Sequence, residues 1–340
     1  MKTITKGKNM NNFKKVGLTA LAGSLAAFSA NAAEMSVSGA SVLTYTSEDK
    51  TEVTGNPFGM KTNLGFTASG EVNGYTVSYM QTSVDQFAGM SSARLSIDMG
   101  DMGTLAFDQG SGSGLATIDD KTPTAAEEIW DGLDGTAVGG LVGAAGNKGV
   151  FNYIQNVGPI TMNAAARLGS GANSADGASS GGNGSAIDVA LTGSGDDMGM
   201  AGLAWGLGYG MVESGSETGT THDSDDIHMT VFGNYSMGPA TFGVQLSDIN
   251  KSANGATDES VQAWGLAFNV NDNLSISYGE REVEFAKASA QHVTEKGDGV
   301  AVAYTMGSIK IAGNRNAVSA NNGTTGSDDQ MTEIAVSFAF

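Results

Sequence analysis

The chain has 340 residues, and its 17 basic and 36 acidic residues give a net charge of −19 at pH 7. This excess of acid argues against nucleic-acid binding, which needs a basic surface. Cysteine is absent, which excludes disulfides, thiol chemistry and cysteine-based metal sites. We find no Pro-rich linker, composition break or repeat of solenoid period, so one large domain is the simplest organisation.

Residues 1–32 are organised as a secretory signal peptide. Five lysines and no acid are followed by an apolar run at 16–28 and by the small-residue site Ala30-Asn31-Ala32. The apolar run is shorter than the roughly 20 residues that a membrane-spanning helix needs. We expect cleavage before Ala33, and Met10 begins an alternative, complete signal. Without the five signal lysines, 12 basic residues face 36 acidic ones, a net charge of −24.

From Met35 onward the sequence alternates with period two in segments of roughly ten residues, the pattern of membrane-spanning β-strands. In 59–72 the even positions are mostly apolar and the odd ones mostly polar, and Asn73-Gly74 then forms a two-residue hairpin turn. Similar alternation recurs at 35–45, 75–79, 93–99, 105–107, 150–157, 160–168, 187–191, 203–211, 227–235, 242–246, 264–270, 274–278, 300–306, 309–311 and 331–340. These segments predict about sixteen strands, an even number as in closed bacterial barrels. Only at 150–157 does the pattern leave open which face is apolar.

The connections between these strands alternate between tight turns and long polar loops. The tight turns lie at 73–74, 100–103, 158–159, 238–239, 271–273 and 307–308. Short turns at one end and long loops at the other are typical of an up-and-down barrel in an outer membrane. A water-soluble β-sandwich has no reason to place its short turns at one end and its long loops at the other. The alternative to a barrel is an extracellular all-β adhesin or a solenoid.

The last segment, 331–340, has one apolar face and one small or polar face and ends on Phe340. An unpaired lipophilic edge strand is an aggregation hazard, whereas a barrel pairs its last strand with its first. This segment resembles the C-terminal assembly signal of Gram-negative outer-membrane β-barrel proteins.

With these features assembled, residues 33–340 resemble the sixteen-stranded general diffusion porins, and among them the acidic ones of alphaproteobacteria. The resemblance implies a homotrimer in the outer membrane of a Gram-negative bacterium, embedded in lipid. It also implies a water-filled channel for passive diffusion of small hydrophilic solutes and ions, without a cofactor. In the family, the third external loop is the longest, folds into the lumen and faces basic wall residues. Here the connection 109–147 is the longest, although the family's Pro-Glu-Phe-Gly-Gly turn is absent.

The resemblance implies a pore constriction between acids of the third loop and bases of the wall. The loop acids that we favour are Asp119, Asp120, Glu127 and Glu128, and Ile129 and Trp130 could anchor the loop apolarly. A transverse field between the two sets would orient dipolar solutes. The acidic balance predicts modest cation preference. The wall bases that we place at the constriction are Lys61, Arg94, Arg167 and Arg281; Lys310 also has polar parity. The alternative is that these bases are solvated lumen residues without a shared role.

Other features have less specific interpretations. The glycines 206, 208 and 210 could leave room for the inserted loop or mark a tightly curved wall. Acidic loops containing Asp223, Asp225, Asp226, Asp328 and Asp329 could bind Ca²⁺, although solvation is the commoner role of such loops. Aromatic residues that could form the interfacial girdles are Trp205, Tyr209, Tyr235, Trp264, Tyr278, Tyr304 and Phe340.

Searches for catalytic chemistry give no candidate, so we do not expect an enzyme. The three histidines, at 222, 228 and 292, have no recognisable Ser or Asp spacing around them. Residues 143–148 lack the spacing of a phosphate-binding loop, and the Gly-rich stretch 181–184 occurs once, whereas a calcium-binding β-roll repeats it. Two alternatives to a general porin stay open: a solute-specific porin, and a surface adhesin or structural barrel with a plugged lumen.

Overall fold

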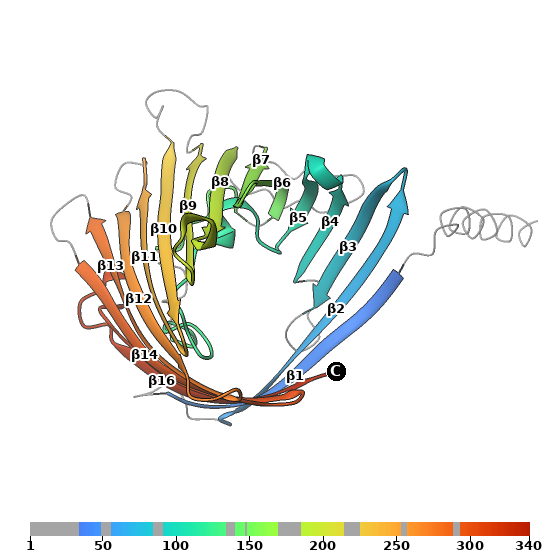
Figure 1. Cartoon of the computed structure of the whole chain (residues 1–340). Helices are drawn as coiled ribbons and strands as arrows, with labels where there is room; N and C mark the ends of the chain where they lie inside the picture. The colour runs from blue at the N-terminus through green and yellow to red at the C-terminus, as the bar shows by residue number, and fades with distance from the viewer. Residues whose placement is uncertain are drawn as a thin grey trace, which may run out of the picture.

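The computed structural model describes residues 34–48, 56–83, 91–133, 140–146, 148–168, 185–213, 225–252, 257–287 and 293–340. The expected signal peptide lies outside these residues. Within them, sixteen strands form a closed antiparallel barrel in which each strand pairs with its neighbours in sequence (Figure 1). The strands are β1 (Glu34–Glu48), β2 (Phe58–Val72), β3 (Tyr75–Ser83), β4 (Ser92–Asp98), β5 (Thr104–Gln109), β6 (Lys148–Val157), β7 (Ile160–Arg167), β8 (Ala186–Ser194), β9 (Leu203–Val212), β10 (Asp226–Met237), β11 (Ala240–Asn250), β12 (Thr257–Asn269), β13 (Leu274–Lys287), β14 (Val293–Met306), β15 (Ile309–Ser319) and β16 (Asp329–Ala339). The predicted fold class and strand number are confirmed.

The barrel closes where the last strand meets the first, as the edge argument predicts. Ala339 pairs with Ala40, and the register continues to Met331 opposite Glu48. Phe340 extends the ladder beyond β16, because its backbone N–H and C=O each bond to Gly39 at 2.9 Å. A Cβ at Gly39 would lie 2.7 Å from the Phe340 ring, so the missing side chain there makes room for the terminal aromatic.

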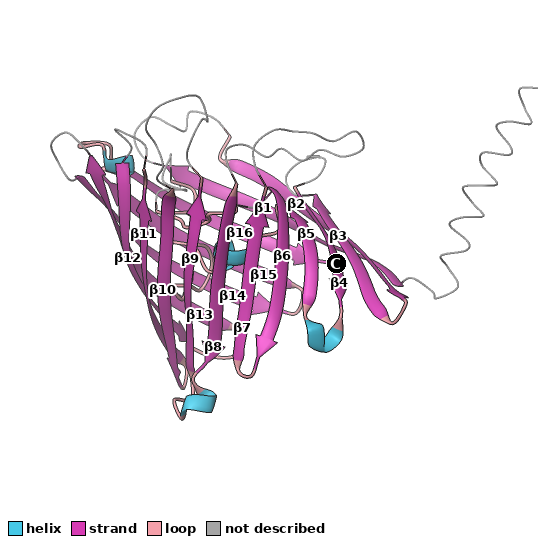
Figure 2. Cartoon of the chain, turned by 90° about the horizontal axis from the view of Figure 1, so that it is seen from above, coloured by secondary structure: helices cyan, strands magenta, loops and turns pink. Residues whose placement is uncertain are grey.

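In the described part of the chain, helical structure is confined to short 3₁₀ turns. Among the described residues these are η1 (Gly100–Met102), η2 (Gly114–Thr117), η3 (Asp196–Met198) and η4 (Asn321–Gly323). In the same ranges no helix is long and apolar enough to cross a membrane. Figure 2 shows η1 and η3 at the end of the barrel that carries the tight turns, and η2 between the walls.

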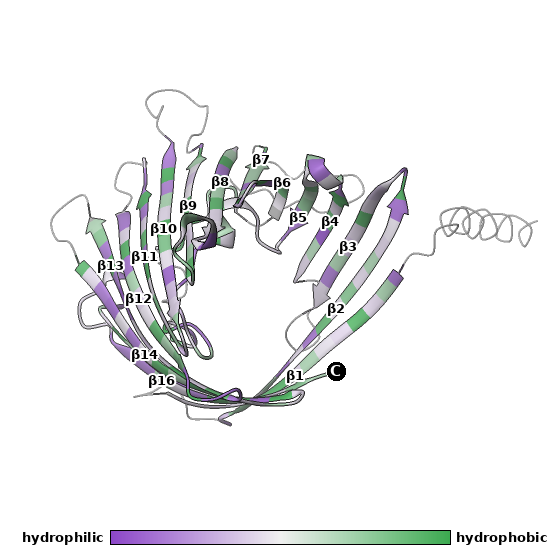
Figure 3. Cartoon of the chain, viewed as in Figure 1, coloured by the Kyte–Doolittle hydropathy of each residue, from purple (hydrophilic) through white to green (hydrophobic). Residues whose placement is uncertain are grey.

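The outer surface is apolar and the inner surface polar, and the alternation is visible along the strands in Figure 3. Side chains such as Leu246, Val302 and Ile334 are about half exposed, although they are large and apolar. Successive residues of a strand point to opposite faces, so their neighbours in sequence point inward. A broad exposed apolar band of this kind is stable only when lipid covers it.

Strand β6 explains why the alternation is unclear at 150–157. Phe151 and Val157 point outward and are 48% and 61% exposed. Val150 points inward yet is fully buried, in a cluster with Ala145, Ala165 and Ala186. The inner wall is therefore apolar at this point, because a segment of chain inside the barrel covers it.

The strands β12, β13 and β14 are longer than the apolar alternation predicts. β13 continues to Lys287, past the predicted limit at 278, and β14 begins at Val293. In the added part the outward side chains are charged, among them Glu280, Glu282 and Asp298. Hydrophobic alternation ends where the apolar band ends, while the hydrogen-bonded ladder continues beyond it.

Candidate functional site

The segment between β5 and β6 runs along the inner wall of the barrel, shown in green inside the ring of strands in Figure 1. We refer to residues 110–146 as the lumenal segment; of these, 134–139 lie outside the described residues. Its helix η2 contacts β7, β8 and β9. Its other described residues bond to inward side chains of β10 to β13 and β15 and pack against β14, so the segment follows more than half of the wall.

The lumenal segment turns away from the sheet at Asp108, which is fully buried at the end of β5. One carboxylate oxygen of Asp108 accepts hydrogen bonds from the backbone N–H and hydroxyl of Ser111, and the other accepts from the Ser113 hydroxyl at 2.7 Å. A carboxylate that satisfies three donors replaces the water they would otherwise bind. Asp108 therefore sets the direction in which the segment enters the lumen.

A row of polar side chains on β4, β6 and β7 positions the first turn of the segment. Arg94 donates to the amide oxygen of Asn152, and Asn152 donates to that of Asn163. The Asn163 oxygen also accepts the backbone N–H of Gly114 at 2.9 Å. Arg94, which we expected at the constriction, thus belongs to the network that supports the start of η2.

Asp188 on β8 joins the two ends of the lumenal segment. Its carboxylate accepts the backbone N–H of Leu115 at 3.0 Å and that of Ala145 at 2.7 Å. Arg167 on β7 donates to the carbonyl of Ala145 at 3.0 Å. The predicted wall base Arg167 therefore also holds the segment, by its returning end.

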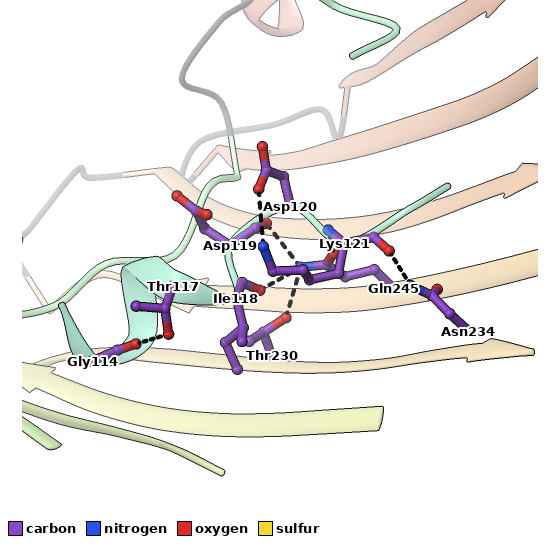
Figure 4. Close-up of polar contacts among 9 residues, drawn as sticks. All are labelled: Gly114, Thr117, Ile118, Asp119, Asp120, Lys121, Thr230, Asn234 and Gln245. Atoms are coloured by element: carbon purple, nitrogen blue, oxygen red, sulfur yellow. Dashed lines mark hydrogen bonds and ion pairs between the residues drawn. The ribbon is translucent and has the colours of Figure 1, made fainter. Parts of the chain in front are cut away.

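Gln245 on β11 holds the middle of the segment through its side-chain amide (Figure 4). Its Nε2 donates to the carbonyls of Ile118 and Asp119 at 3.0 and 2.8 Å, and its Oε1 accepts the N–H of Lys121 at 2.6 Å. Asn234 on β10 donates to the carbonyl of Lys121 at 2.7 Å. Four hydrogen bonds from two wall amides thus fix the backbone that carries Asp119 and Asp120.

Replacing Gln245 with alanine is expected to destabilise the folded barrel by about 3 kcal/mol, because three bonds to the segment are lost and their backbone partners are left buried. Urea unfolding of the detergent-refolded protein measures this change. The control is Gln262→Ala, which removes the same side chain from the exposed outer face of β12. Equal effects of the two substitutions would show that the Gln245 contacts do not stabilise the fold.

The segment next crosses β13, β14 and β15. The Ser277 hydroxyl accepts the N–H of Ala125 at 2.9 Å. The amide of Asn316, which is 1% exposed, donates to the carbonyls of Glu128 and Asp131 at 3.1 and 2.9 Å. These contacts hold the backbone of residues 125–131 against this part of the wall.

Arg281 lies beneath the segment instead of facing open lumen. It is 3% exposed, its guanidinium carbon lies 4.7 Å from the centre of the Trp130 ring, and its Nη1 lies 3.5 Å from a carboxylate oxygen of Glu295. A guanidinium over an indole face is attracted by the ring electrons. The inward direction predicted for Arg281 is correct, but its contacts make it an anchor for Trp130.

The returning half of the segment is held at two further points. The N–H of Gly140 donates to a carboxylate oxygen of Glu259 on β12 at 2.5 Å, and Lys251 pairs with the other oxygen. The N–H of Gly143 donates to Nδ1 of His228 on β10 at 3.3 Å. His228 is therefore a structural acceptor here.

Glycines on the inner wall mark the path of the segment. A Cβ at Gly208 would lie 2.2 Å from Leu115, and one at Gly210 would lie 2.5 Å from Ala144. The expectation that these glycines leave room for the loop is thus met, whereas Gly206 faces the ring of Phe232, a neighbour within the wall. The path continues over four further glycines of the inner wall. Gly243 and Gly265 face Pro123, and Gly279 and Gly299 face Ile129.

The predicted acids lie on the part of the segment that these contacts fix. Asp119, Asp120 and Glu128 are half-buried, and Glu127 is exposed. Asp119 and Asp120 line a small crevice that also contains Arg281. Burial, together with the neighbouring charge of Asp120, raises the pKa of Asp119 to about 7. Burial also raises the pKa of Glu128.

Of the predicted bases, Lys61 alone is an exposed side chain. It points inward from β2 and acts electrostatically on Glu333 of β16, as do Glu127 and Asp131 of the segment. The structure thus places this base and several acids around the same part of the lumen. The other three bases, Arg94, Arg167 and Arg281, bind the segment or the residues that support it.

The acidic loops show no preformed metal site in the part of the chain that is described. No group of three or more Asp, Glu or His residues there is arranged to hold a metal ion. Asp223 lies outside the described residues. Asp226 accepts two bonds from Ser252, and Asp328 accepts the N–H of Ala320, so these two carboxylates cap loops.

No protein-family model matches the chain. No curated protein matches it either.

Solved structures of porins and of another outer-membrane protein do match it. A porin structure superposes with a TM-score of 0.66 at 14% identity, covering 90% of this chain and 100% of that one. The trimer form of OmpT, an outer membrane protein of Vibrio cholerae, gives 0.65 at 14% identity over 91% of this chain and 100% of that one. An anion-selective porin from Comamonas acidovorans gives 0.61 at 13% identity over 91% and 100%. At these identities the likeness establishes a porin-like barrel fold.

Proposed function

We propose that this protein is a general diffusion porin of a Gram-negative outer membrane, of the acidic alphaproteobacterial kind, with a water-filled lumen narrowed by residues 110–146. The observation that carries the proposal is the lumenal segment itself. Its described residues are bonded to the wall from β7 to β15 and reach β16, where Leu133 packs against Met331, and this leaves the polar inner face of β1 to β3 uncovered. Small hydrophilic solutes and ions would cross between the two without energy coupling, and no step requires catalysis or a cofactor.

The narrowest part of the channel lies between Lys61 on the wall and four acids on the lumenal segment, namely Asp119, Asp120, Glu127 and Glu128. Low-dielectric walls focus the field of such groups, so that they act on any ion that passes. Acids outnumber bases at this point, and we therefore propose modest cation preference. We also propose a homotrimer, supported by the trimer form of the similar Vibrio cholerae protein.

Liposome swelling tests the proposal without relying on ion selectivity. Liposomes that contain the mature protein should swell in arabinose, and more slowly in larger sugars as solute size rises. A correctly folded barrel that admits no sugar would contradict the proposal and favour the plugged structural or adhesin barrel. Swelling confined to one class of solute would favour a solute-specific porin.

The raised pKa of Asp119 predicts a pH dependence of the cation preference. The carboxyl titrates near pH 7 in the folded protein, so it is neutral at pH 5 and ionised at pH 9. Reversal potentials in planar bilayers should therefore show a cation-to-anion permeability ratio that rises about twofold to fivefold over this range. Asp119→Asn should remove the step near pH 7, and Asp101→Asn in the exposed turn η1 should keep it. An unchanged step in Asp119→Asn would refute the assignment.

The raised pKa of Asp119 also determines how the stability of the folded protein depends on pH. Its pKa is higher in the folded protein than the usual 3.8, so the folded state binds this proton more tightly than the unfolded chain does. Its contribution to stability is complete below pH 3.8 and is lost as the pH rises through about 7.

A further inference from the structure

The outer surface of strands β12 to β16 carries an apolar groove of about 610 Å³. Gly313 on β15 forms its floor. A Cβ added there would meet only the Glu333 carbonyl at 3.6 Å and Val302 at 3.7 Å, which are ordinary contact distances. The side walls are apolar residues of the lipid-facing band, namely Leu266, Phe268, Ile276, Val300 and Ile334.

At the end nearer the long loops, the groove meets a polar cavity of the same volume, about 610 Å³. Tyr278 lines both cavities. The polar cavity is lined by Glu280, Glu282, Lys296, Asp298 and Gln330 among others. The groove and the cavity therefore adjoin at Tyr278, and together they make an amphipathic depression that is apolar toward the middle of the band and charged at its edge.

The charged residues at this edge are held in place by their neighbours. Arg315 lines the groove at its charged end and donates to the Thr332 hydroxyl at 3.2 Å and to the Gln330 side chain at 2.8 Å. Glu280 accepts the Tyr278 hydroxyl at 2.6 Å and the indole N–H of Trp264 at 3.2 Å. These bonds fix a cation and an anion at the mouth of the groove.

The strand register also brings two acids together there. Glu280 on β13 is the register partner of Asp298 on β14. Like charges directly opposite one another in a sheet repel. A cationic group bound between these carboxylates would relieve the repulsion, while Arg315 on the far side of β14 would attract a nearby anion.

We propose that this depression binds one zwitterionic phospholipid. One acyl chain lies in the groove over Gly313, the phosphate contacts Arg315, and the ammonium group contacts Glu280 and Asp298. An anionic lipid would pair with Arg315, but it has no cationic group to place beside the carboxylates of Glu280 and Asp298. The inference rests on the lipid-facing barrel surface and is independent of whether the lumen conducts.

Native mass spectrometry of the detergent-refolded protein tests the proposal, with 16:0/18:1 phosphatidylethanolamine and 16:0/18:1 phosphatidylglycerol as probes. The unaltered protein should bind phosphatidylethanolamine severalfold more tightly. Gly313→Phe should weaken phosphatidylethanolamine binding about tenfold, the effect of displacing about two methylene groups from apolar contact. Aromatic residues are well tolerated in strands, so the barrel should still form.

Two further variants separate the acyl-chain groove from the head-group contacts. Gly233→Phe places the same side chain on the lipid-facing side of β10, where a Cβ has nothing within 4 Å, and it should leave binding unchanged. Asp298→Asn should reduce the preference for phosphatidylethanolamine while keeping the groove intact. Equal affinity of the unaltered protein for the two lipids, or equal effects of Gly313→Phe and Gly233→Phe, would overturn the proposal.

Discussion

Replacing residues 110–147 with a short Asn-Gly turn is expected to raise the single-channel conductance severalfold. Gln109 and Lys148 are register partners on β5 and β6, so a tight turn can join them without moving either strand. The wall that the deletion exposes is lined by polar groups such as Asp188, Gln245 and Asn316, which water can solvate. The barrel ladder does not depend on the segment, because every strand keeps both of its neighbours.

Conductance in planar bilayers measures this effect, and heat-modifiable mobility on gels confirms that the shortened chain still forms a barrel. Gln245→Ala is a useful intermediate, because it loosens the middle of the segment without deleting it, and it should increase current noise. A shortened, correctly folded barrel whose conductance equals that of the full-length protein would show that residues 110–146 do not narrow the path.

Neutralising Asp120, Glu127 and Glu128 together, as Asp→Asn and Glu→Gln, should lower the cation-to-anion permeability ratio about fivefold or more. A unit charge about 4 Å from a permeating ion contributes about 1 kcal/mol even in bulk water, and more beside a low-dielectric wall. Reversal potentials under a KCl gradient measure the ratio. Asp119 is left unchanged, because its pKa near 7 makes it only partly charged at neutral pH.

A matched control for this prediction exists on the outer surface. Glu282, Glu284 and Asp298 all have the parity that points away from the lumen, and their neutralisation removes the same charge and the same residue types. The control should change the ratio little, because salt screens charges separated from the path by the wall. A change of similar size in both variants would assign the selectivity to net charge and not to the lumenal segment.

The barrel could be predicted from the sequence because its cause is local. Lipid on one side of each strand and water or polar contacts on the other impose an alternation that every segment carries by itself, and Asn73-Gly74 marks its turn in the same way. In the structure Asn73 and Gly74 both have positive φ, 53° and 84°, as the type I′ turn requires. The pattern was unclear at Val150 because that inner position is covered by the lumenal segment.

The contacts of the lumenal segment could not be predicted in the same way. They depend on which residues of strands far apart in sequence lie at the same height along the barrel axis. The direction of Arg281 followed from parity, but its burial under Trp130 depends on the path that the segment takes across β13. The clearest missed signal is the set of inward glycines at 243, 265, 279 and 299. Each lies on a successive strand from β11 to β14, and together they mark where a backbone approaches the wall.

The most direct test of the account is the single-channel conductance of the purified mature protein in planar bilayers, with the reversal potential measured under a KCl gradient. The account predicts discrete open levels and a reversal potential on the cation-preferring side. A heat-modifiable, correctly folded barrel that shows no conductance would contradict an open lumen, and a chloride-preferring reversal potential would contradict the role given to the acids of residues 119–128.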